Sequence, residues 1–332
     1  MFQIELVCDF RESFPSKFVD GVEVFNDHPK KDSVLEILDA INEIGYPCNI
    51  FGGVPELLKA SQNNNRYEDK IFINLSDGLN QSYSRVQVPM LCEILKVKYS
   101  GSPPFVAALM NNKHYSKLAL NELDVLIPAG FLINKHTQLK AELFKRLNFP
   151  IIVKPNTEGS SLGITLKSVC DTIEEAHLQI ENLLAEFEEV LIEEYIAGYD
   201  VTNLVIGNKN DIKLNEVIVI QSHQGLINYR EVFGIYEKAN KLSTRLIGEE
   251  VFSSEQVTKI QLTSEKIAAH IGAIDICRID YRVTDSGDIY FLEINSVPRI
   301  STSSEVGFIC SKRNISFKDV LQYYIESVLS RF

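Results

Sequence analysis

Arg278-Ile279-Asp280 and Phe291-Leu292-Glu293-Ile294-Asn295 are the two stretches that decide the fold, with Glu293 thirteen residues after Asp280. Alternate side chains of a strand share a face, so Arg278 and Asp280 point one way, and Glu293 and Asn295 share a face of the second stretch. The segment Thr284–Asp288 between them is typical of a hairpin turn. We therefore expect two adjacent antiparallel strands that bring one guanidinium and three oxygen-bearing side chains together.

The oxygen donors of this predicted hairpin suit a metal ion. Asp280, Glu293 and Asn295 offer carboxylate and amide oxygens, which Mg²⁺ accepts, usually from few protein ligands together with phosphate oxygens. The alternative is an exposed hairpin with polar residues on its solvent face. The hairpin alone leaves both interpretations open.

Length and composition are those of an ordinary globular protein. The 332 residues are enough for two or three packed units, and 45% are hydrophobic and 23% charged. A formal net charge of −12 argues against nucleic acid or an anionic membrane surface as the main partner. No signal peptide or membrane-length apolar run is visible, and the six scattered cysteines form no Cys-x-x-Cys pair. We expect a cytoplasmic protein with buried thiols rather than disulfides or zinc.

Residues 1–102 predict an α/β unit with a parallel sheet. Strands are expected at Phe2–Cys8, Cys48–Phe51 and Ile71–Leu75, and helices at Ser33–Ile44 and Val86–Leu95. Ser33 is the expected N-cap of its helix and Gly45 the expected stop. Ser76-Asp77-Gly78 follows a strand end, where ligands collect in open parallel sheets, so Asp77 is a candidate substrate residue; an ordinary turn is the alternative.

Gly101-Ser102-Pro103-Pro104 is typical of a loop between structural units, and we place the first domain boundary after residue 102. Residues 103–189 predict a small α+β unit, and residues 190–332 predict a strand-rich unit with an antiparallel sheet. The central unit should contain helices near 105–110, 113–122, 137–147 and 171–187, and strands at Ile151–Lys154 and Ile164–Lys167. The last unit should contain strands near 190–193, 200–206, 213–220, 274–283 and 289–295, and helices at Val257–Ile271 and Phe317–Leu329.

A loop rich in glycine and serine follows the apolar strand that ends at Lys154-Pro155. In Asn156–Gly163 the glycines let backbone N–H groups approach a ligand, and Ser160 and Ser161 add hydroxyl donors. Such a loop can close over nucleotide phosphates, although the Gly-x-x-x-x-Gly-Lys-Ser/Thr order of a P-loop is absent. A hairpin tip without function is the alternative, and the lysine and paired serines argue against it.

The acidic segment Val190–Asp200 is a second candidate for nucleotide contact. An extended segment can present backbone N–H and C=O groups to an adenine edge, while an acidic side chain takes ribose hydroxyls. A strand and turn with solvated acids is the alternative. This segment alone does not separate the two.

Together these motifs resemble the ATP-grasp superfamily, and within it the D-alanine–D-alanine ligase family. The resemblance covers nearly the whole chain, and the motifs occur in the family's order with its gaps. They are Lys113, Val153-Lys154-Pro155 with Gly159-Ser160-Ser161-x-Gly163, Ile192-Glu193-Glu194-Tyr195-Ile196-x-Gly198-x-Asp200, Cys277-Arg278-Ile279-Asp280-Tyr281 and Leu292-Glu293-Ile294-Asn295-x-x-Pro298. The resemblance implies a three-domain ATP-grasp fold.

The resemblance also implies an ATP-dependent carboxylate–amine ligase. The family phosphorylates a carboxylate with ATP to give an acyl phosphate, which an amine then attacks with release of phosphate. The implied partners are small amino-acid or carboxylate substrates, and the implied cofactors are ATP and Mg²⁺, with Mn²⁺ as a substitute. The implied default assembly is a homodimer.

Carried over by position, the resemblance assigns roles at the phosphate end of the site. Lys113 and Lys154 would hold ATP phosphates, and Ser160 and Ser161 would sit in the mobile loop that closes over them. Arg278 would stabilise the tetrahedral intermediate and the transferred phosphoryl group. The implied ligands of one or two Mg²⁺ ions are Asp280, Glu293 and Asn295.

The same resemblance assigns the nucleoside end of the site. Glu193 would bind the adenine amino group, and Glu194 and Ile196 would offer backbone groups of the hinge. Asp200 would take the ribose hydroxyls, where the family usually has the longer glutamate.

The chain departs from the family pattern at the substrate end. The family's N-terminal Gly-Gly-x-Ser-x-Glu, whose glutamate anchors the first substrate's ammonium, is not found, and the corresponding stretch runs through Phe25–Pro29. Asn74–Gly78 followed by Ser84-Arg85 replaces the family's His-Gly…Gly-Glu-Asp-Gly segment. The family's Tyr-x-Tyr-x-x-Lys segment is blurred around Tyr229, where Arg230 or Lys238 would replace its lysine.

Arg299 replaces the glycine of the family's Asn-x-x-Pro-Gly motif. Arginine does not adopt the dihedral angles of glycine as cheaply, and its guanidinium can grip a substrate carboxylate bidentately. The alternative is that Arg299 points to solvent. Ser304 matches the family serine that contacts the carboxylate of the second substrate.

The chain keeps the family motifs that would bind ATP and Mg²⁺, but it differs from the family in the motifs that would bind the amino-acid substrates. We expect a ligase that forms an amide bond through an acyl phosphate, with D-Ala–D-Ala ligation as the nearest named activity. A dipeptide or secondary-metabolite amino-acid ligase is the main alternative. A non-catalytic ATP-binding regulator is an alternative of another class, against which the intact Arg278, Asp280, Glu293 and Asn295 argue.

Overall fold

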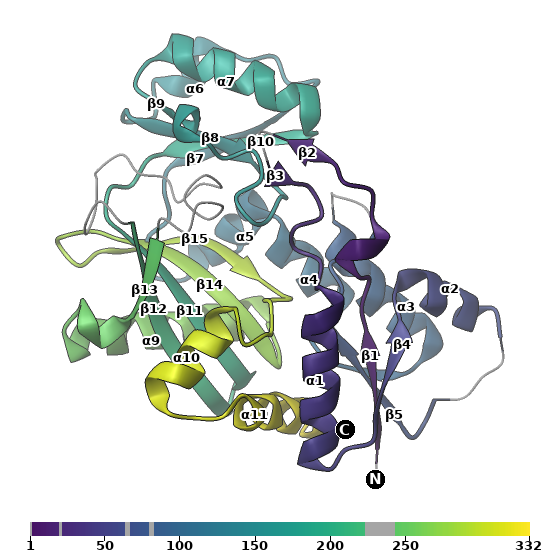
Figure 1. Ribbon diagram of the computed structural model, residues 1–332. Coiled ribbons are helices and arrows are strands. Elements are labelled where there is room, and N and C mark those ends of the chain that lie inside the picture. Colours follow the sequence, from purple (N-terminus) through teal and green to yellow (C-terminus); the bar gives the residue numbers. More distant parts are fainter. Residues whose placement is uncertain (1, 20–21, 64–66, 80–82, 223–242) are drawn as a thin grey trace.

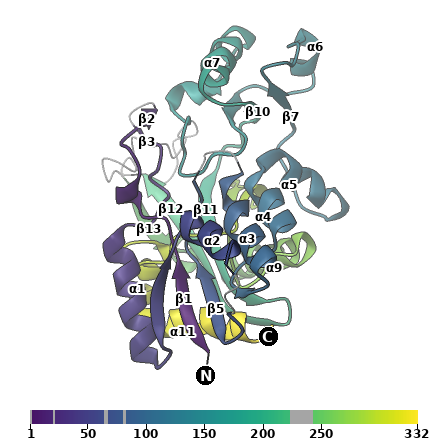
Figure 2. The same cartoon turned by 90° about the vertical axis from the view of Figure 1, so that its right-hand side faces the viewer.

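The computed structural model describes residues 2–19, 22–63, 67–79, 83–222 and 243–332. Its larger sheets are a parallel sheet in the N-terminal part, a small antiparallel sheet and a five-stranded antiparallel sheet (Figure 1). The small sheet and its helices stand at the top of both views, above the other two units (Figures 1 and 2). This arrangement confirms the predicted α/β fold class.

The N-terminal unit is a four-stranded parallel sheet in the order β4-β1-β5-β6. Its strands are β1 (Gln3–Val7), β4 (Cys48–Gly52), β5 (Lys70–Asn74) and β6 (Lys98–Tyr99), and its helices are α1 (Lys31–Ile44), α2 (Val54–Ser61) and α3 (Gln87–Leu95). The predicted N-cap at Ser33 is wrong, because α1 begins earlier, with Lys30 as N-cap. A distant carboxylate supplies the missing cap, since Glu12 accepts the Lys31 N–H at 3.3 Å. The predicted stop is confirmed: Gly45 ends α1 with a φ of 104°.

The C-terminal unit is a five-stranded antiparallel sheet in the order β13-β12-β11-β14-β15. Its strands are β11 (Tyr199–Asn208), β12 (Asp211–Ser222), β13 (Ser243–Ile247), β14 (Ile276–Val283) and β15 (Ile289–Asn295). Alternate residues of β11 enter different cores: Val201 and Val205 pack with α9 (Ser254–Ile271), whereas Leu204 and Ile206 pack with α11 (Phe317–Leu329). Both faces of this sheet are therefore covered.

Three shorter helices flank this sheet. They are α4 (Pro104–Asn111), α5 (Lys113–Ala119) and α10 (Glu305–Arg313). Met110 at the end of α4 joins the core beneath α9, and α5 packs against β15. The helices predicted near 105–110 and 113–122 thus lie beside β15.

The central unit is a four-stranded antiparallel sheet in the order β7-β10-β8-β9. Its elements are β7 (Gly130–Asn134), α6 (Ala141–Phe144), β8 (Ile151–Pro155), β9 (Val169–Cys170), α7 (Ile173–Glu186) and β10 (Glu189–Glu194). The predicted strand at Ile164–Lys167 is wrong, because Thr165 caps a short 3-10 turn there and Leu166 is 70% exposed with no strand beside it. The predicted helix near 137–147 is reduced to α6.

A short hairpin links the N-terminal unit to the central one. Its strands are β2 (Phe18–Val19) and β3 (Val22–Glu23), and they reach up to the central sheet in Figure 1. Val19 packs against the central core. The segment that follows β3 consequently runs beneath the loop of residues 156–163, where it contributes to the site described below.

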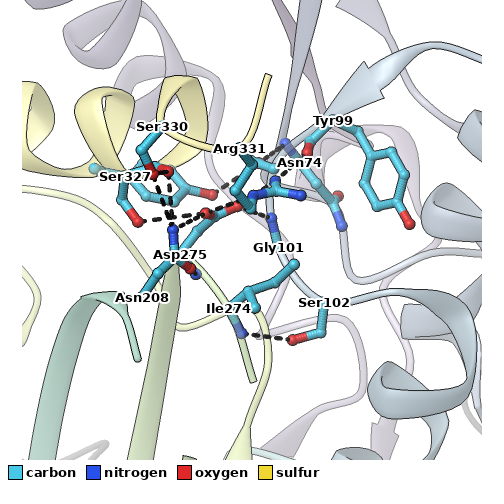
Figure 3. A network of polar contacts seen from close by, with 12 residues as sticks. Asn74, Tyr99, Gly101, Ser102, Asn208, Ile274, Asp275, Ser327, Ser330 and Arg331 are labelled. Carbon is cyan, nitrogen blue, oxygen red and sulfur yellow. Dashed lines mark hydrogen bonds and ion pairs between the residues drawn. The ribbon is translucent and has the colours of Figure 1, made fainter. Parts of the chain in front are cut away.

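A buried acidic residue ties the end of the chain to the other units (Figure 3). Arg331 donates to both carboxylate oxygens of the fully buried Asp275, at 3.0 and 2.6 Å. The Gly101 N–H donates to the same carboxylate at 2.8 Å, and the Ser327 hydroxyl at 3.3 Å. Burial raises the pKa of Asp275, although Arg331 opposes the increase. The contacts thus join the C-terminal end of α11, the C-terminal sheet and the segment 101–104. The division of the chain into domains after residues 102 and 189 stays a prediction.

Two expectations from composition can be compared with the described residues. All six cysteines are free and five of them are buried, which confirms the predicted thiols. Within the described ranges, no helix combines the length and apolar character needed to cross a membrane.

Candidate active site

The predicted hairpin is formed by β14 and β15. In their antiparallel register Asp280 lies opposite Glu293, and Arg278 lies opposite Asn295. Arg278 donates from Nε and Nη2 to the two oxygens of Asp280 at 3.0 and 2.8 Å, and the hydroxyl of Thr202 on β11 donates to Asp280 Oδ1 at 2.5 Å. The predicted meeting of these side chains is confirmed, and their roles stay predictions.

Lys113 connects helix α5 to this hairpin. It is the first residue of α5, and its Nζ lies 3.0 Å from Glu293 Oε2. Burial alone would raise the pKa of Glu293, but Lys113, with help from Lys154 and Arg278, lowers it. Burial raises the pKa of Asp280 and Arg278 opposes this, while the charge of Glu293 adds to the increase. Because the two carboxylates face each other, a further cation at this point would be stabilised.

Three buried side chains form a charge cluster near Lys113 and the hairpin. Glu193 on β10 contacts Lys154 Nζ through Oε1 at 2.5 Å, and Lys117 Nζ through Oε2. Burial lowers the pKa of Lys117 to about 8, against the opposing charge of Glu193, and Lys154 adds to the decrease. The sequence interpretation missed Lys117, although its spacing of four residues from Lys113 on one helix could have revealed it.

The Glu193 carboxylate, which the family resemblance assigns to the adenine amino group, lies between two lysines. It is 1% exposed and both its oxygens meet lysines. Burial opposes ionisation, but Lys117 and Lys154 lower the pKa of Glu193. Its observed partners are thus the phosphate-binding candidate Lys154 and its neighbour Lys117, and its contact with adenine stays a prediction.

The glycine–serine loop lies over this cluster. Ser160 and Ser161 both have left-handed backbones, with φ of 48° and 62°. The Ser160 hydroxyl donates to Asp27 from the segment that follows β3, and the Lys113 ammonium donates to the Glu158 carbonyl. Two consecutive non-glycine residues in this region are strained, which is typical of functional loops. The loop, the N-terminal segment and α5 therefore meet above the hairpin.

The predicted nucleoside segment runs from β10 into β11. The Glu194 carboxylate accepts from the backbone N–H and side-chain amide of Asn148, both at 2.8 Å, and its own N–H donates to Ala129 at 2.8 Å. Ile196 is half-buried. Asp200 Oδ1 lies 3.1 Å from Arg282 Nη2, and this arginine also donates to the Gly198 carbonyl at 2.9 Å. The segment is thus fixed at both ends around Ile196.

The candidate substrate loop at Asp77 borders a cavity. Arg85 Nε donates to Asp77 Oδ1 at 2.7 Å, and Arg85 Nη2 lies 3.3 Å from Asp27 Oδ2. The cavity between these residues is small, about 40 Å³, and opens to solvent. His28 and Asn111 are among its lining residues, and the buried His28 Nδ1 and Asn111 Nδ2 have no hydrogen-bond partner among the described residues. Unsatisfied buried polar atoms are costly, so this cavity has the features of a ligand site.

The other substrate candidates are placed as follows. Arg299 is exposed, and its Nη2 donates to the Asn26 carbonyl at 2.5 Å. Ser304 is buried and caps α10, with its hydroxyl donating to the Ser301 carbonyl at 2.8 Å. Tyr229 and its candidate lysine replacements, Arg230 and Lys238, lie outside the described residues.

The residues at the hairpin fit a hard cation that also binds phosphate. The described ranges hold no cluster of three or more His, Cys, Asp or Glu side chains suited to a metal. Asp280 and Glu293 are nevertheless paired across the strands, and Asn295 Oδ1 lies on the same hairpin, where it accepts the Val297 N–H at 3.1 Å. Two carboxylates and an amide leave coordination positions for ligand oxygens, as Mg²⁺ sites with bound nucleotides do.

A parallel N-terminal sheet, a small antiparallel sheet that carries the buried Lys154, and a larger sheet with an acidic hairpin meet at one site. This combination of elements is that of the ATP-grasp class, which the sequence motifs also indicated.

Comparison with known proteins identifies the family within this class. A family model described as D-ala D-ala ligase C-terminus matches residues 116–326, and the chain belongs to this family. The D-alanine–D-alanine ligase of Aquifex aeolicus is 29% identical over 259 residues, which are 77% of this chain and 81% of that protein. The same-named ligase of Parabacteroides distasonis is 29% identical over 241 residues, or 71% and 69% of the two chains.

Solved structures show the same fold. The D-alanine–D-alanine ligase from Bacillus anthracis in complex with ATP matches with a TM-score of 0.73 at 18% identity, covering 99% of this chain and 98% of that one. The VanG D-Ala:D-Ser ligase from Enterococcus faecalis matches with a TM-score of 0.72 at 18% identity, covering 98% and 99%. The predicted family resemblance and ATP-grasp fold are therefore confirmed.

Proposed function

We propose that this protein uses ATP to phosphorylate a carboxylate and joins the activated acid to an amine. The observation that carries the proposal is the 3.0 Å contact between Lys113 Nζ and Glu293 Oε2. It brings a phosphate-binding candidate from α5 to a metal-binding candidate on β15. Phosphoryl transfer requires positioning and charge neutralisation more than covalent chemistry by the protein. The site supplies both.

In this proposal Lys113 and Lys154 hold the ATP phosphates. Glu193 keeps Lys154 in place through their 2.5 Å contact, and Lys117 balances the second Glu193 oxygen. Ser160 and Ser161 lie in the loop above, where closure excludes water that would hydrolyse an acyl phosphate. The nucleoside would lie along the segment with Glu194 and Ile196, with its ribose at Asp200.

The hairpin would hold the metal and stabilise developing charge. Asp280, Glu293 and Asn295 are the proposed ligands of Mg²⁺, which when bound neutralises phosphoryl oxygens. Arg278 is fixed by its two hydrogen bonds to Asp280, so its guanidinium is preorganised for the charge of the reacting group. The contribution of the chain itself is thus the bidentate contact of Asp280, which positions the Arg278 guanidinium.

Amino acids are the proposed substrates, because the curated relatives are named D-alanine–D-alanine ligases. The residues at the substrate end favour partners other than two D-alanines, since Asp27, Asp77 and Arg85 form a charged wall around the cavity. Ser304 and Arg299 would face the second substrate. A cytoplasmic homodimer that binds no nucleic acid remains the proposed setting.

The proposal is tested by ADP release from MgATP in the presence of single and paired D- and L-amino acids. Release that depends on an amino acid supports the ligase, and release with D-alanine alone identifies D-Ala–D-Ala ligation. The variant Arg278→Ala should lower the rate of ADP release by about 10²–10³, whereas exposed Glu188→Gln should retain it. ATP binding without release for any amino acid would contradict the proposal and favour a nucleotide-binding regulator.

A further inference from the structure

Two arginines from distant parts of the chain converge on one backbone oxygen. Arg299, four residues after Asn295, donates from Nη2 to the Asn26 carbonyl. Arg11, in the short 3-10 turn Arg11–Ser13, donates from its own Nη2 to the same oxygen. Two full positive charges thus share one neutral acceptor, which compensates neither of them.

The electrostatics of the pair are unbalanced. Among the described residues, no carboxylate lies within ion-pairing distance of Arg11 or Arg299. Arg11 Nε is buried and has no hydrogen-bond acceptor there. Burial lowers the pKa of Arg11, and the charge of Arg299 lowers it further, although Glu23, Asp27 and Glu12 lie close enough to oppose this. A guanidinium that is half-buried, unpaired and beside a like charge is stabilised by an anion.

The surroundings hold the backbone around the shared acceptor in place. Phe14 and Phe25 stack with ring centroids 4.4 Å apart, and His28 packs against Phe14 at 4.2 Å. This aromatic cluster fixes the backbone on both sides of Asn26. The Arg11 N–H also donates to the Pro29 carbonyl at 3.0 Å. The carbonyl that both guanidinium groups contact is consequently held in place.

The pair lies next to the proposed reaction centre. Asn26 precedes Asp27, which accepts the Ser160 hydroxyl of the closing loop and meets Arg85 beside the cavity. On the other side, Arg299 continues the segment that begins at Asn295 on the metal hairpin. Arg299 is exposed, so a ligand can reach its guanidinium.

We propose that Arg11 and Arg299 form a carboxylate subsite that selects an acidic amino acid as one of the two substrates. The inference rests on the proposed ligase function and names a substrate class for it. Guanidinium groups bind carboxylates through charge-assisted, bidentate hydrogen bonds, and a neutral substrate would leave both arginines unpaired. The carboxylate would displace the Asn26 carbonyl as the shared acceptor.

The first experiment compares kinetic parameters for acidic and neutral substrates. ADP release is measured with D- and L-aspartate, D- and L-glutamate, O-phosphoserine and D- and L-alanine, each alone and paired with D-alanine. We expect an acidic amino acid to give at least a tenfold higher kcat/KM than the neutral ones. Arg299→Gly and Arg11→Gln should each raise the KM of that acid at least tenfold and erase the preference. Arg146→Gly, at an exposed arginine of the central unit, is the matched control.

Two outcomes would overturn the subsite while leaving the ligase intact. One is equal or better turnover of neutral amino acids by the wild type. The other is an equal rise of KM for acidic and neutral substrates in Arg299→Gly, which would indicate a structural role. A preference for O-phosphoserine over both dicarboxylic acids would replace the carboxylate assignment by a phosphate one and so overturn it.

A second measurement tests the subsite without turnover. Glutarate, which carries two carboxylates and no amine, is titrated into the wild type and into the double variant R11Q/R299G, and the melting temperature is compared with that in chloride of equal ionic strength. Saturable stabilisation of the wild type alone supports the subsite even if every amino acid fails to release ADP, an outcome that refutes only the ligase. Equal shifts in both proteins overturn the subsite.

Discussion

Replacing Glu193 by glutamine should destabilise the fold by about 3 kcal/mol at pH 7. Lys154 Nζ lies 2.5 Å from Glu193 Oε1, Lys117 contacts the other oxygen, and the side chains are at most 7% exposed. Removing one partner of a buried ion pair costs about 3–5 kcal/mol, because the remaining charge is left uncompensated. The lower end applies here, since Lys117, with a pKa of about 8, can lose its proton at a cost of about 1.4 kcal/mol per pH unit.

The loss should become smaller above pH 8. Burial lowers the pKa of Lys117 from 10.5 to about 8 in the folded protein. Between these two values the unfolded chain binds the proton and the folded chain does not, so the contribution of Lys117 to stability rises with pH across that window. In the wild type the Lys117–Glu193 ion pair is already weakened there, and the substitution removes less.

Urea unfolding followed by far-ultraviolet circular dichroism at pH 7 and about pH 9.5 measures both effects, because the chain has no tryptophan. Glu188→Gln is the matched control: its 2.6 Å contact with Lys135 is exposed, at 70% and 39%, and should contribute less than about 1 kcal/mol. Adding Lys117→Met to Glu193→Gln should restore part of the stability. A Glu193→Gln loss no larger than the control's, or one that grows with pH, would refute the reasoning.

Three further substitutions test other parts of the structure. Arg278→Ala should lower kcat by about 10²–10³ with a smaller change in ATP affinity, and an unchanged kcat at saturating substrates would contradict its role. Asp275→Asn should cost about 2–3 kcal/mol in urea unfolding, because Arg331 and the Gly101 N–H lose a charged acceptor; a loss below about 0.5 kcal/mol would argue against the anchor. Gly163→Ala should cost more than Gly45→Ala: both have positive φ, but only at Gly163 would the new Cβ meet atoms, at 2.7 Å from Pro155. Equal losses in urea would contradict this packing.

The parts of the site that could be predicted are those with short-range patterns. Asp280 and Glu293 are thirteen residues apart, and strand alternation together with one turn determines which side chains face each other. The stop of α1 at Gly45 is similarly local. Sequence patterns failed where the partner is remote. Ser33 was a plausible cap, but Glu12 caps the helix from nineteen residues earlier.

Strand prediction failed for a related reason. Ile164–Lys167 alternates apolar and polar residues as a strand would, yet pairing requires a neighbouring edge, and β8 instead pairs with Val169–Cys170. The contacts of Asp27 with Ser160, and of Arg11 with Arg299 through Asn26, join segments separated by more than a hundred residues. Tertiary packing alone determines such contacts, so no local sequence pattern could predict them.

The distribution of charge distinguishes the two halves of the site. At the nucleotide half each described lysine meets a carboxylate: Lys113 meets Glu293, and Lys117 and Lys154 share Glu193. The excess of one positive charge there suits phosphates that arrive with a metal. At the substrate half Arg11 and Arg299 both donate to one backbone carbonyl, and Glu23, Asp27 and Glu12 are the carboxylates nearest to Arg11. The lysines of the first group are largely balanced by their own carboxylates. The positive charge of Arg11 and Arg299 is available to a substrate, which under the proposed subsite brings an anion of its own.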